Sequence, residues 1–438
     1  MTSLSNVPHS SSTRADSDES PPSLVPLTPL LQRIVGASDP AFRSRLDERA
    51  LVHEAELRQA LFPVTRGYTY LNHAAVGPAP APVAWATRAA FEAVSQRGSL
   101  AMEDRQPEDE VRQRFGRLIN VAPESIAFTK NVSDSFMTIA QGLEWRPGDN
   151  IVTAAGEFPA NVYPWLNLAE QGVETRFAPL VGDRLPLEQI AAQIDQRTRL
   201  VSLSFVEFGS GIRNDVAAIA RLAHAVGALC AVDGIQGLGA LRLDATAAEV
   251  DFLCAGSVKW LLSPAHLGLL YVRPSVLPSL RVARRGWRSV TTPFDFFSYD
   301  QPLRDDAGRL EGGGNSWLAL VALDAALALL EAAGAEQIEA RVLGLAQTTC
   351  TGLCERGYEI TSPGAPAERS AIVTFRWGAE RAQQEDAAAE AVARLTSEAQ
   401  VVISARNGLL RVSPHFYNTD ADIQRLLDSL DQARTQLL

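Results

Sequence analysis

The chain contains few lysines, few cysteines and no excess of positive charge. Its 438 residues include 40 lysines and arginines against 51 aspartates and glutamates, so the formal net charge is −11. An acidic chain without a basic stripe has little with which to neutralise phosphate groups, so we do not expect it to bind nucleic acid. Binding to anionic membrane surfaces is disfavoured for the same reason.

Cysteine and long hydrophobic runs are also scarce. The cysteines at 230, 254, 350 and 354 match no zinc spacing, so we expect no metal and reduced thiols, as in the cytoplasm. The longest apolar run, Leu318–Leu330, is interrupted by Asp324 and is too short to span a bilayer. Residues 1–24 are rich in Ser, Pro and Asp and lack the apolar core of a secretory signal, so we expect a disordered tail.

Lysine is the rarest charged residue in the chain. Of the 40 basic residues, only Lys130 and Lys259 are lysines. Arginine can replace lysine where a positive charge is enough, but it cannot supply an amine that loses its proton and acts as a nucleophile. The two lysines are therefore the first candidates for chemistry.

Short apolar runs typical of strands alternate with helical patterns through the middle of the chain. The runs are Ile126–Thr129, Asn150–Ala154, Leu200–Val206, Ala228–Val232, Phe252–Ala255 and Gly268–Val272. This alternation predicts an α/β fold whose mainly parallel sheet is covered by helices on both faces. After about residue 320, a long Ala/Leu helix and shorter strands predict a smaller C-terminal α+β domain. We divide the chain into the tail 1–24, a helical segment 25–65, a large domain 66–320 and a small domain 321–438.

An acid and an amine follow two of the expected strands. Asp233 comes directly after the strand at 228–232, and Lys259 follows the strand at 252–255. Because open α/β sheets bind ligands at the carboxyl ends of their strands, both side chains should face one site. Pyridoxal 5′-phosphate (PLP) needs this pair: the amine forms an imine with its aldehyde, and the carboxylate keeps its pyridine nitrogen protonated. We therefore expect PLP as the cofactor, an amino acid as the substrate and Lys259 as the catalytic residue.

Four further motifs point the same way. They are YLNHAAVGP (70–78), KNVSDSF (130–136), EFPANVYPW (157–165) and RVSPHFYNT (411–419). With the Asp233/Lys259 segment they resemble the class V aminotransferase family, which includes cysteine desulfurases, isopenicillin N epimerase-like proteins and kynureninases. The resemblance extends from Tyr68 to the C-terminus. It implies PLP fold type I, with a seven-stranded type of sheet in the large domain.

The resemblance also implies roles for individual residues. A helix N-terminus at Val132 and Ser133 would bind the phosphate, because free N–H groups and the helix dipole favour anions. Phe158 would stack on the ring and Arg411 would bind the substrate carboxylate. The implied cofactor-binding residues of one subunit are Lys259, Asp233, Gln236, Phe158, Val132, Ser133 and Ser257, and the implied substrate-binding residues are Arg411, His73 and Asn161.

Two glycine- and arginine-rich segments resemble the contribution of a partner subunit. RRGWRSV (284–290) and LEGGGNS (310–316) would bring Trp287, Gly313 and Asn315 to the phosphate pocket of the other copy. The resemblance therefore implies a homodimer with shared active sites.

The chain also departs from the family pattern. Val258 and Gly314 replace side chains that relatives use near the phosphate, and residues 397–411 contain no cysteine where desulfurases keep their sulfur-accepting nucleophile. We expect an aminotransferase or a β-eliminating C–S lyase. The alternatives are an epimerase, a kynureninase-like C–C hydrolase, which Phe158 and FGSGIRND favour, and a non-catalytic PLP-fold binding protein. The presence of Lys259, Asp233 and Arg411 together argues against the last of these.

Overall fold

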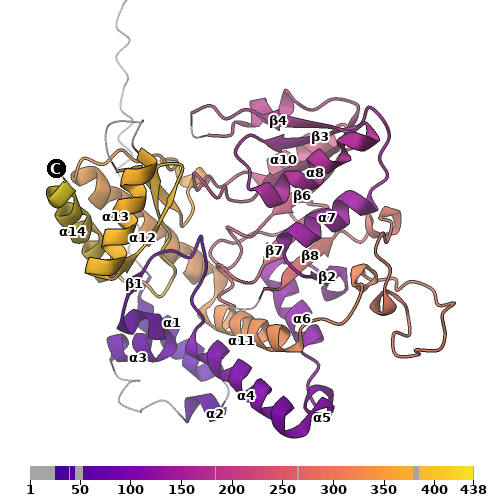
Figure 1. The fold of residues 1–438 in the computed structure, drawn as a ribbon, viewed down its shortest axis with the longest axis horizontal. Coiled ribbons are helices and arrows are strands. Elements are labelled where there is room, and N and C mark those ends of the chain that lie inside the picture. Colours follow the sequence, from indigo (N-terminus) through magenta and orange to yellow (C-terminus); the bar gives the residue numbers. More distant parts are fainter. Residues whose placement is uncertain are drawn as a thin grey trace, which may run out of the picture.

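The computed structural model describes residues 25–38, 40–44, 53–182, 184–263, 266–377 and 384–437 (Figure 1). The expected tail at residues 1–24 lies outside these ranges. A seven-stranded sheet in the order β2-β8-β7-β6-β5-β3-β4 forms the centre of the larger part of the molecule. Its strands are β2 (Ile126–Thr129), β3 (Asn150–Ala154), β4 (Glu174–Ala178), β5 (Thr198–Ser204), β6 (Leu229–Asp233), β7 (Phe252–Gly256) and β8 (Gly268–Val272).

Only β8 runs antiparallel to its neighbours, which are β2 and β7. All other neighbouring pairs in this sheet are parallel. The prediction of an α/β fold with a mainly parallel sheet is therefore confirmed.

Alternate residues of each strand face two separate cores. In β7, Leu253 and Ala255 face the core that includes α6 (Pro107–Ile119), α10 (Val216–His224) and α11 (Trp317–Ala333). Phe252 and Cys254 face the other core, beneath α7 (Val132–Gly142). This period of two in fully buried strands produces the continuous apolar runs that the sequence showed.

The sequence patterns did not predict the edge strand β4. Four of its five residues are partly or fully exposed, and only Ala178 is buried. An edge strand needs no continuous apolar run, so its sequence lacks the signal that identified the central strands. Residues 163–171, whose apolar pattern is helical, form the short helix α8 (Tyr163–Leu166) followed by a 3₁₀ turn.

The N-terminal helices pack against α11 and against one another. They are α1 (Leu27–Ala37), α2 (Pro40–Arg43), α3 (Glu54–Leu61), α4 (Ala81–Arg97) and α5 (Ser99–Glu103). The remaining short helices are α9 (Leu187–Ala191), η2 (Pro63–Arg66), η3 (Pro123–Ser125), η4 (Pro159–Asn161), η5 (Asn167–Gln171), η6 (Leu277–Ser279), η7 (Trp287–Ser289), η8 (Ala307–Leu310) and η9 (Pro366–Glu368).

In the described ranges no single helix is long and apolar enough to cross a bilayer. The adjacent pair α11 and α12 meets that length and composition together but is bent by 81°.

The C-terminal unit consists of helices packed on a small antiparallel sheet. Its elements are α12 (Ala335–Glu355), β9 (Val373–Arg376), α13 (Gln384–Ala399), β10 (Val401–Val402), β11 (Ser404–Arg406), β12 (Leu409–Val412) and α14 (Asp420–Leu437). The sheet order is β11-β12-β9, whereas β10 pairs in parallel with β1 (Thr69–Tyr70). Ile360 forms only an isolated bridge with Phe375 of β9.

The core of this unit begins at Leu345, in the second half of α12. Ile338 and Val342, earlier in the same helix, belong to the large core. The division that we placed at residue 320 falls within α11, most of whose side chains are buried in the large core.

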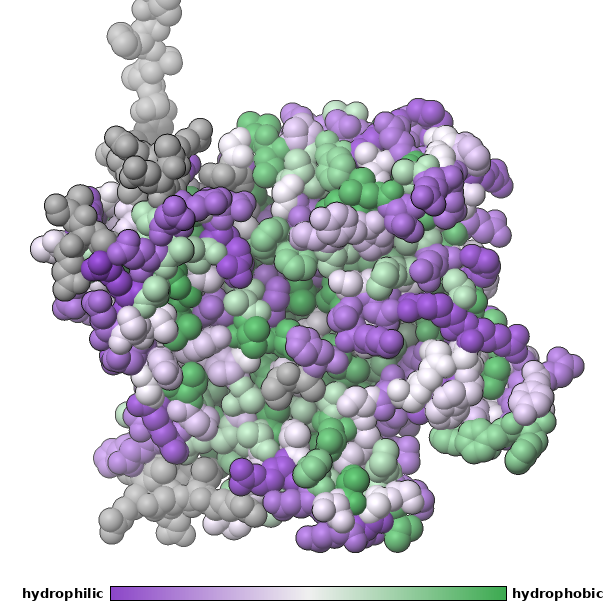
Figure 2. All heavy atoms as spheres, viewed as in Figure 1, coloured by the Kyte–Doolittle hydropathy of each residue, from purple (hydrophilic) through white to green (hydrophobic). Residues whose placement is uncertain are grey.

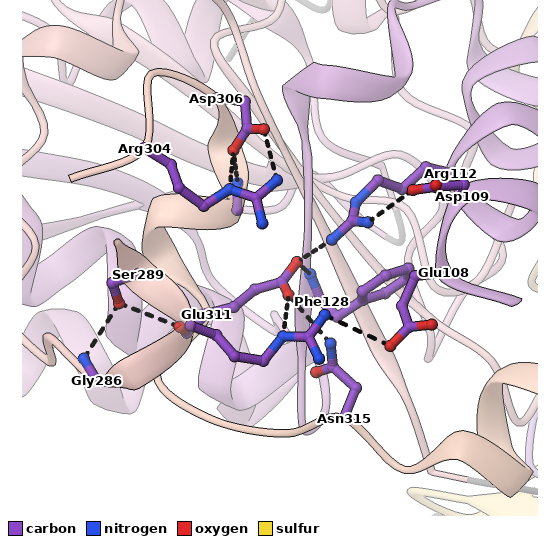
Figure 3. A network of polar contacts seen from close by, with 12 residues as sticks. Glu108, Asp109, Arg112, Phe128, Gly286, Ser289, Arg304, Asp306, Glu311 and Asn315 are labelled. Carbon is purple, nitrogen blue, oxygen red and sulfur yellow. Dashed lines mark hydrogen bonds and ion pairs between the residues drawn. The ribbon is translucent and has the colours of Figure 1, made fainter. Parts of the chain in front are cut away.

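A buried glutamate anchors the loop between η8 and α11 (Figure 3). The Oε1 atom of Glu311 accepts a 2.5 Å hydrogen bond from Nη2 of Arg112 and a 3.1 Å bond from the N–H of Phe128. Its Oε2 atom accepts a 3.0 Å hydrogen bond from Nδ2 of Asn315. Because Glu311 is only 2% exposed, these bonds offset the cost of burying its charge and hold the glycine-rich loop against β2.

Candidate active site

The carboxyl ends of β3, β5 and β6 and the turn after β7 meet at one edge of the sheet. Asp233 is the last residue of β6 and pairs with Ser204 of β5 and Cys254 of β7. Lys259 lies three residues beyond β7, and its Nζ atom is 5.6 Å from the centre of the Phe158 ring, which follows β3. The expected convergence of strand ends thus brings the acid, the amine and the aromatic ring to one place.

Asp233 presents one unsatisfied oxygen to this site. The side chain is 1% exposed, and its Oδ1 atom accepts a 2.9 Å hydrogen bond from the N–H of Ile235. No described residue binds the buried Oδ2 atom. Burial raises the pKa of Asp233 to about 6, although the Ile235 bond and the charge on Lys259 act in the opposite direction. A cationic partner at Oδ2 would remove the cost of this buried carboxylate.

Lys259 is held in a tight turn and is poised to lose its proton. Burial lowers the pKa of its amine to about 8, and Asp233 opposes that change. The turn lies close against residues 69–77, which we call the entry segment, because Gly77 donates a 2.8 Å backbone hydrogen bond to the carbonyl of Val258. A Cβ atom at Gly77 would approach the carbonyl oxygen of Lys259 to 2.2 Å, so only glycine fits there.

Arg411 reaches the site from β12 of the C-terminal unit. It is 1% exposed, and its Nη1 atom donates a 2.6 Å hydrogen bond to the carbonyl of Phe208, just after β5. Its Nε atom donates to Oγ of Ser404 at 3.2 Å. The buried Nη2 atom has no partner among the described residues. A guanidinium with a free buried donor is suited to a carboxylate ligand.

Two further predicted residues, Val132 and Ser133, are the first two residues of α7. Asn131 caps the helix by accepting a hydrogen bond from the N–H of Asp134, so Ser133 is not the cap. The Ser133 side chain therefore remains available at a helix N-terminus of the kind that binds anions. Ser133 and Phe158 also line a cavity of about 800 Å³ beside α7.

Gln236 and Ser257 bind groups on the rim of the site. Gln236 donates to the carbonyl of Ala74 at 3.0 Å and accepts from Nε1 of Trp260 at 3.1 Å. One amide N–H of Gln236 remains for a ligand. The hydroxyl of Ser257 accepts a 3.1 Å hydrogen bond from the N–H of Leu267, which steadies the connection between β7 and β8.

His73 and Asn161, predicted to contact substrate, are fully buried. The ring of His73 lies 2.9 Å from both the carbonyl of Ser413 and the hydroxyl of Tyr417, so both nitrogens have partners in the chain. Oδ1 of Asn161 accepts hydrogen bonds from Nε1 of Trp165 and from Oγ of Ser202. Both ring nitrogens of His73 thus have partners within the chain, whereas the buried Nδ2 atom of Asn161 has no partner among the described residues. The predicted contact of Asn161 with a ligand stays a prediction.

Trp287, Gly313 and Asn315 form a separate group on the loop around Glu311. A Cβ atom at Gly313 would lie 3.8 Å from Nε1 of Trp287, so the two segments are adjacent. Within the described part of the chain, no hydrogen bond or ion pair connects this group to Lys259. Their predicted role in a partner's site is consistent with this separation.

Two further acids lie at the same strand ends, and the sequence patterns did not identify them as site residues. Glu157 accepts hydrogen bonds from the N–H of Ser204 at 2.6 Å and from its hydroxyl at 2.7 Å. Glu207 accepts a 2.8 Å hydrogen bond from Nδ2 of Asn214. Burial raises the pKa of both, that of Glu207 to about 7, and the charge of Asp233 adds to the effect. The position of each acid three residues after the end of a strand, β3 or β5, was the available signal.

A family model described as aminotransferase class-V matches residues 69–426. The chain belongs to the class-V aminotransferase family. One relative, the uncharacterized aminotransferase YcbU of Bacillus subtilis, is 26% identical over 378 residues, covering 86% of this chain and 98% of that protein. A probable cysteine desulfurase of Methanothermobacter thermautotrophicus is 29% identical over 391 residues, covering 84% of this chain and 96% of that protein.

Solved structures agree with the fold of a class-V aminotransferase. The apo cysteine desulfurase of Thermococcus onnurineus has a TM-score of 0.75 at 22% identity, covering 85% of this chain and 96% of that chain. The cystine C–S lyase C-DES, in complex with its reaction product cysteine persulfide, has a TM-score of 0.76 at 24% identity. That match covers 84% of this chain and 98% of the lyase chain.

Membership of the class-V aminotransferase family confirms PLP as the cofactor. It also confirms the predicted enzyme class, a PLP-dependent enzyme of the aminotransferase or C–S lyase type. The residues fit this cofactor: the unpartnered Oδ2 of Asp233 suits a protonated pyridine nitrogen, and Lys259 offers an amine within the same site.

Proposed function

We propose that this chain binds an amino acid through Arg411 and moves the proton at its Cα atom through Lys259. The observation that carries the proposal is the placement of one amine, one buried acid with a free oxygen and one buried guanidinium with a free donor at the same edge of the sheet. When bound there, PLP supplies an electron sink for the electron pair left at Cα.

Each side chain has a separate task in this proposal. Asp233 keeps a proton on the pyridine nitrogen, and Phe158 covers one face of the ring and excludes water from it. Arg411 orients the substrate by its carboxylate, which sets the Cα–H bond toward Lys259. An amine whose pKa is about 8 holds and releases a proton readily near neutral pH, as a general base at Cα must.

The positions of the cysteines argue against a persulfide intermediate on the protein. Residues 397–411 end α13 and form β10, β11 and β12 without a thiol. Cys230 and Cys254 are buried in the sheet, and burial raises the pKa of Cys350 on α12 to about 11. A thiol that stays protonated is a poor sulfur acceptor. We therefore propose an aminotransferase or a β-eliminating C–S lyase.

The proposal predicts the products from sulfur amino acids. Incubation with cysteine and S-substituted cysteines should form pyruvate if the chain is a lyase. An absorbance change that a keto acid reverses would instead identify an aminotransferase. Alanine, pyruvate and protein-bound persulfide are measured together. Alanine with a persulfide on Cys350 or Cys354 would contradict the proposal, and an absence of spectral change with a full amino-acid panel would indicate a binding protein.

We also propose a homodimer, in which the loop between η7 and η8 lies against a second copy. This loop projects from the body of the molecule and carries hydrophobic residues on its surface (Figures 1 and 2). Phe294, Phe296 and Phe297 are 70%, 60% and 90% exposed. The cavity beside α7, lined in part by Met137 and Tyr163, offers a complementary apolar surface. In a twofold dimer each loop would cover the partner's cavity.

Replacing Phe297 by aspartate should shift the dimer toward monomer, because a charge would be buried at the contact. Sedimentation velocity at micromolar concentration measures this shift, and retention of PLP should fall with it if the phosphate pocket is shared. Phe177, 40% exposed on the edge strand β4, provides the matched control, F177D. Equal dimer content in F297D and in the parent chain would refute the assignment of this loop.

A further inference from the structure

A second arginine lies on the same face of the small sheet as Arg411. The register between β11 and β12 places Ser404 opposite Arg411 and Arg406 opposite Leu409. Arg406 and Arg411 are therefore diagonal neighbours, a relation that places Cβ atoms about 7–8 Å apart and within reach of long side chains. The hydrogen bond from Nε of Arg411 to Oγ of Ser404 fixes this face as the one that carries Arg411.

Because side chains alternate between the two faces along each strand, this face points away from the core of the C-terminal unit. Leu410 and Val412 of β12 are buried in the core of the C-terminal unit, and Ala405 of β11 packs against it. The opposite face, with Arg406 and Arg411, is the one from which Arg411 reaches Phe208 beyond β5. Arg406 is exposed at the end of the hairpin, whereas Arg411 is buried at its base.

Neither guanidinium is neutralised by the chain. Among the described residues, no carboxylate forms an ion pair with Arg406, whose Nη1 atom donates only to the neighbouring carbonyl of Ala405 at 2.6 Å. The nearby acids Glu157 and Glu207 are bound by Ser204 and Asn214. Arg406 also lowers the pKa of both Arg411 and Lys259, so its charge acts within the same site.

The hairpin is built to hold Arg406 in this position. Asn407 and Gly408 connect β11 to β12 with φ values of 49° and 75°, the left-handed conformation that a tight two-residue turn requires. Such a turn leaves little freedom to the residue before it. Two unpaired positive charges on one rigid face repel each other, and an anionic ligand that contacts both would relieve that repulsion.

We infer that Arg406 and Arg411 together select an amino acid with a second carboxylate at the end of its side chain. This inference rests on the proposed function, in which Arg411 binds the α-carboxylate. Arg406 then contacts the side-chain carboxylate, and the spacing between the two arginines favours a substrate with a short side chain. Amino acids with uncharged side chains lack that second contact.

The test compares anions that bind without reacting. Isothermal titration calorimetry with the holoenzyme measures dissociation constants for succinate and glutarate, with propionate and butyrate as monocarboxylate controls. The dicarboxylates should bind at least about tenfold more tightly, since one additional charge-assisted contact is worth that much. Arg406→Gln should reduce this ratio to about one, chiefly by weakening the binding of the dicarboxylates. Arg394→Gln, which changes an exposed arginine paired with Glu390 on α13, is the matched control.

Kinetics give a second readout. KM for aspartate or glutamate should rise about tenfold in R406Q, KM for alanine should change by a much smaller factor, and Arg406→Glu should disfavour the acidic substrates further. An R406Q enzyme that keeps the ratio of the parent chain would overturn the inference while leaving the proposed function intact. If the parent holoenzyme shows no spectral change with any amino acid, the proposed function itself fails.

Discussion

Replacing Lys259 by alanine should abolish covalent attachment of the cofactor and lower turnover by about 10⁴-fold, because one amine serves both as the attachment point and as the base at Cα. Borohydride reduction of the parent protein followed by peptide mapping should find the cofactor on Lys259. The K259A variant should give no reduced adduct at all. The phosphate and ring contacts remain in this variant, so weak reversible binding of PLP is still expected.

Lys130 is the matched control, because it is the other lysine of the chain and is exposed before α7. The K130A variant should retain the reducible attachment on Lys259. An adduct mapped to Lys130, or turnover by K259A within tenfold of the parent, would exclude the assigned role of Lys259.

Replacing Asp233 by asparagine should lower turnover by about 10³-fold while the protein stays folded. Asparagine cannot hold the pyridine nitrogen in its charged state, and loss of one such electrostatic contact costs this much in other active sites. The measurement is kcat with a reactive amino acid, together with the absorption spectrum of bound PLP. Near-normal turnover by D233N would mean that another acid protonates the ring, and Glu157 and Glu207 would be the candidates.

The same substitution should stabilise the apoprotein, although it lowers turnover of the holoenzyme. The pKa of Asp233 is raised to about 6, so its ionisation destabilises the folded chain as pH rises from about 4 to 6 and remains fully unfavourable above 6. Without PLP, D233N should be more stable than the parent by about 3 kcal/mol at pH 8. Urea unfolding of both apoproteins should show this gap narrowing at pH 5.

Much of this structure is readable from local patterns. The six apolar runs of the central sheet correspond to strands because each is buried on both faces, and Asp233 and Lys259 meet because strand ends share one edge. The family resemblance and the cofactor followed from motifs at these same strand ends, and the family match over residues 69–426 confirms both.

The features that were missed depend on tertiary contacts. The edge strand β4 has no apolar run, because one side of it faces solvent. His73 lies within a family motif, but its two hydrogen bonds come from residues more than 300 positions later in the chain, so no local pattern reveals that it is fully bound. The Asn407–Gly408 pair, in contrast, is a local hairpin signal, and a two-residue turn there is enough to predict that Arg406 lies beside Arg411.

The pairing of β1 with β10 constrains how the two parts of the molecule can move. The entry segment joins β10, bridges Ser413 through Asn72 and then continues to Gly77, which lies against the backbone of Lys259. The C-terminal unit is therefore connected to the large unit through this segment as well as through α12 and through the hydrogen bond from Arg411 to Phe208. We expect a displacement of β10 and the C-terminal unit to move this segment, which lies against the turn that carries Lys259. The arginine proposed to bind the substrate carboxylate and the lysine proposed to move the proton therefore lie on different units that share this connecting segment.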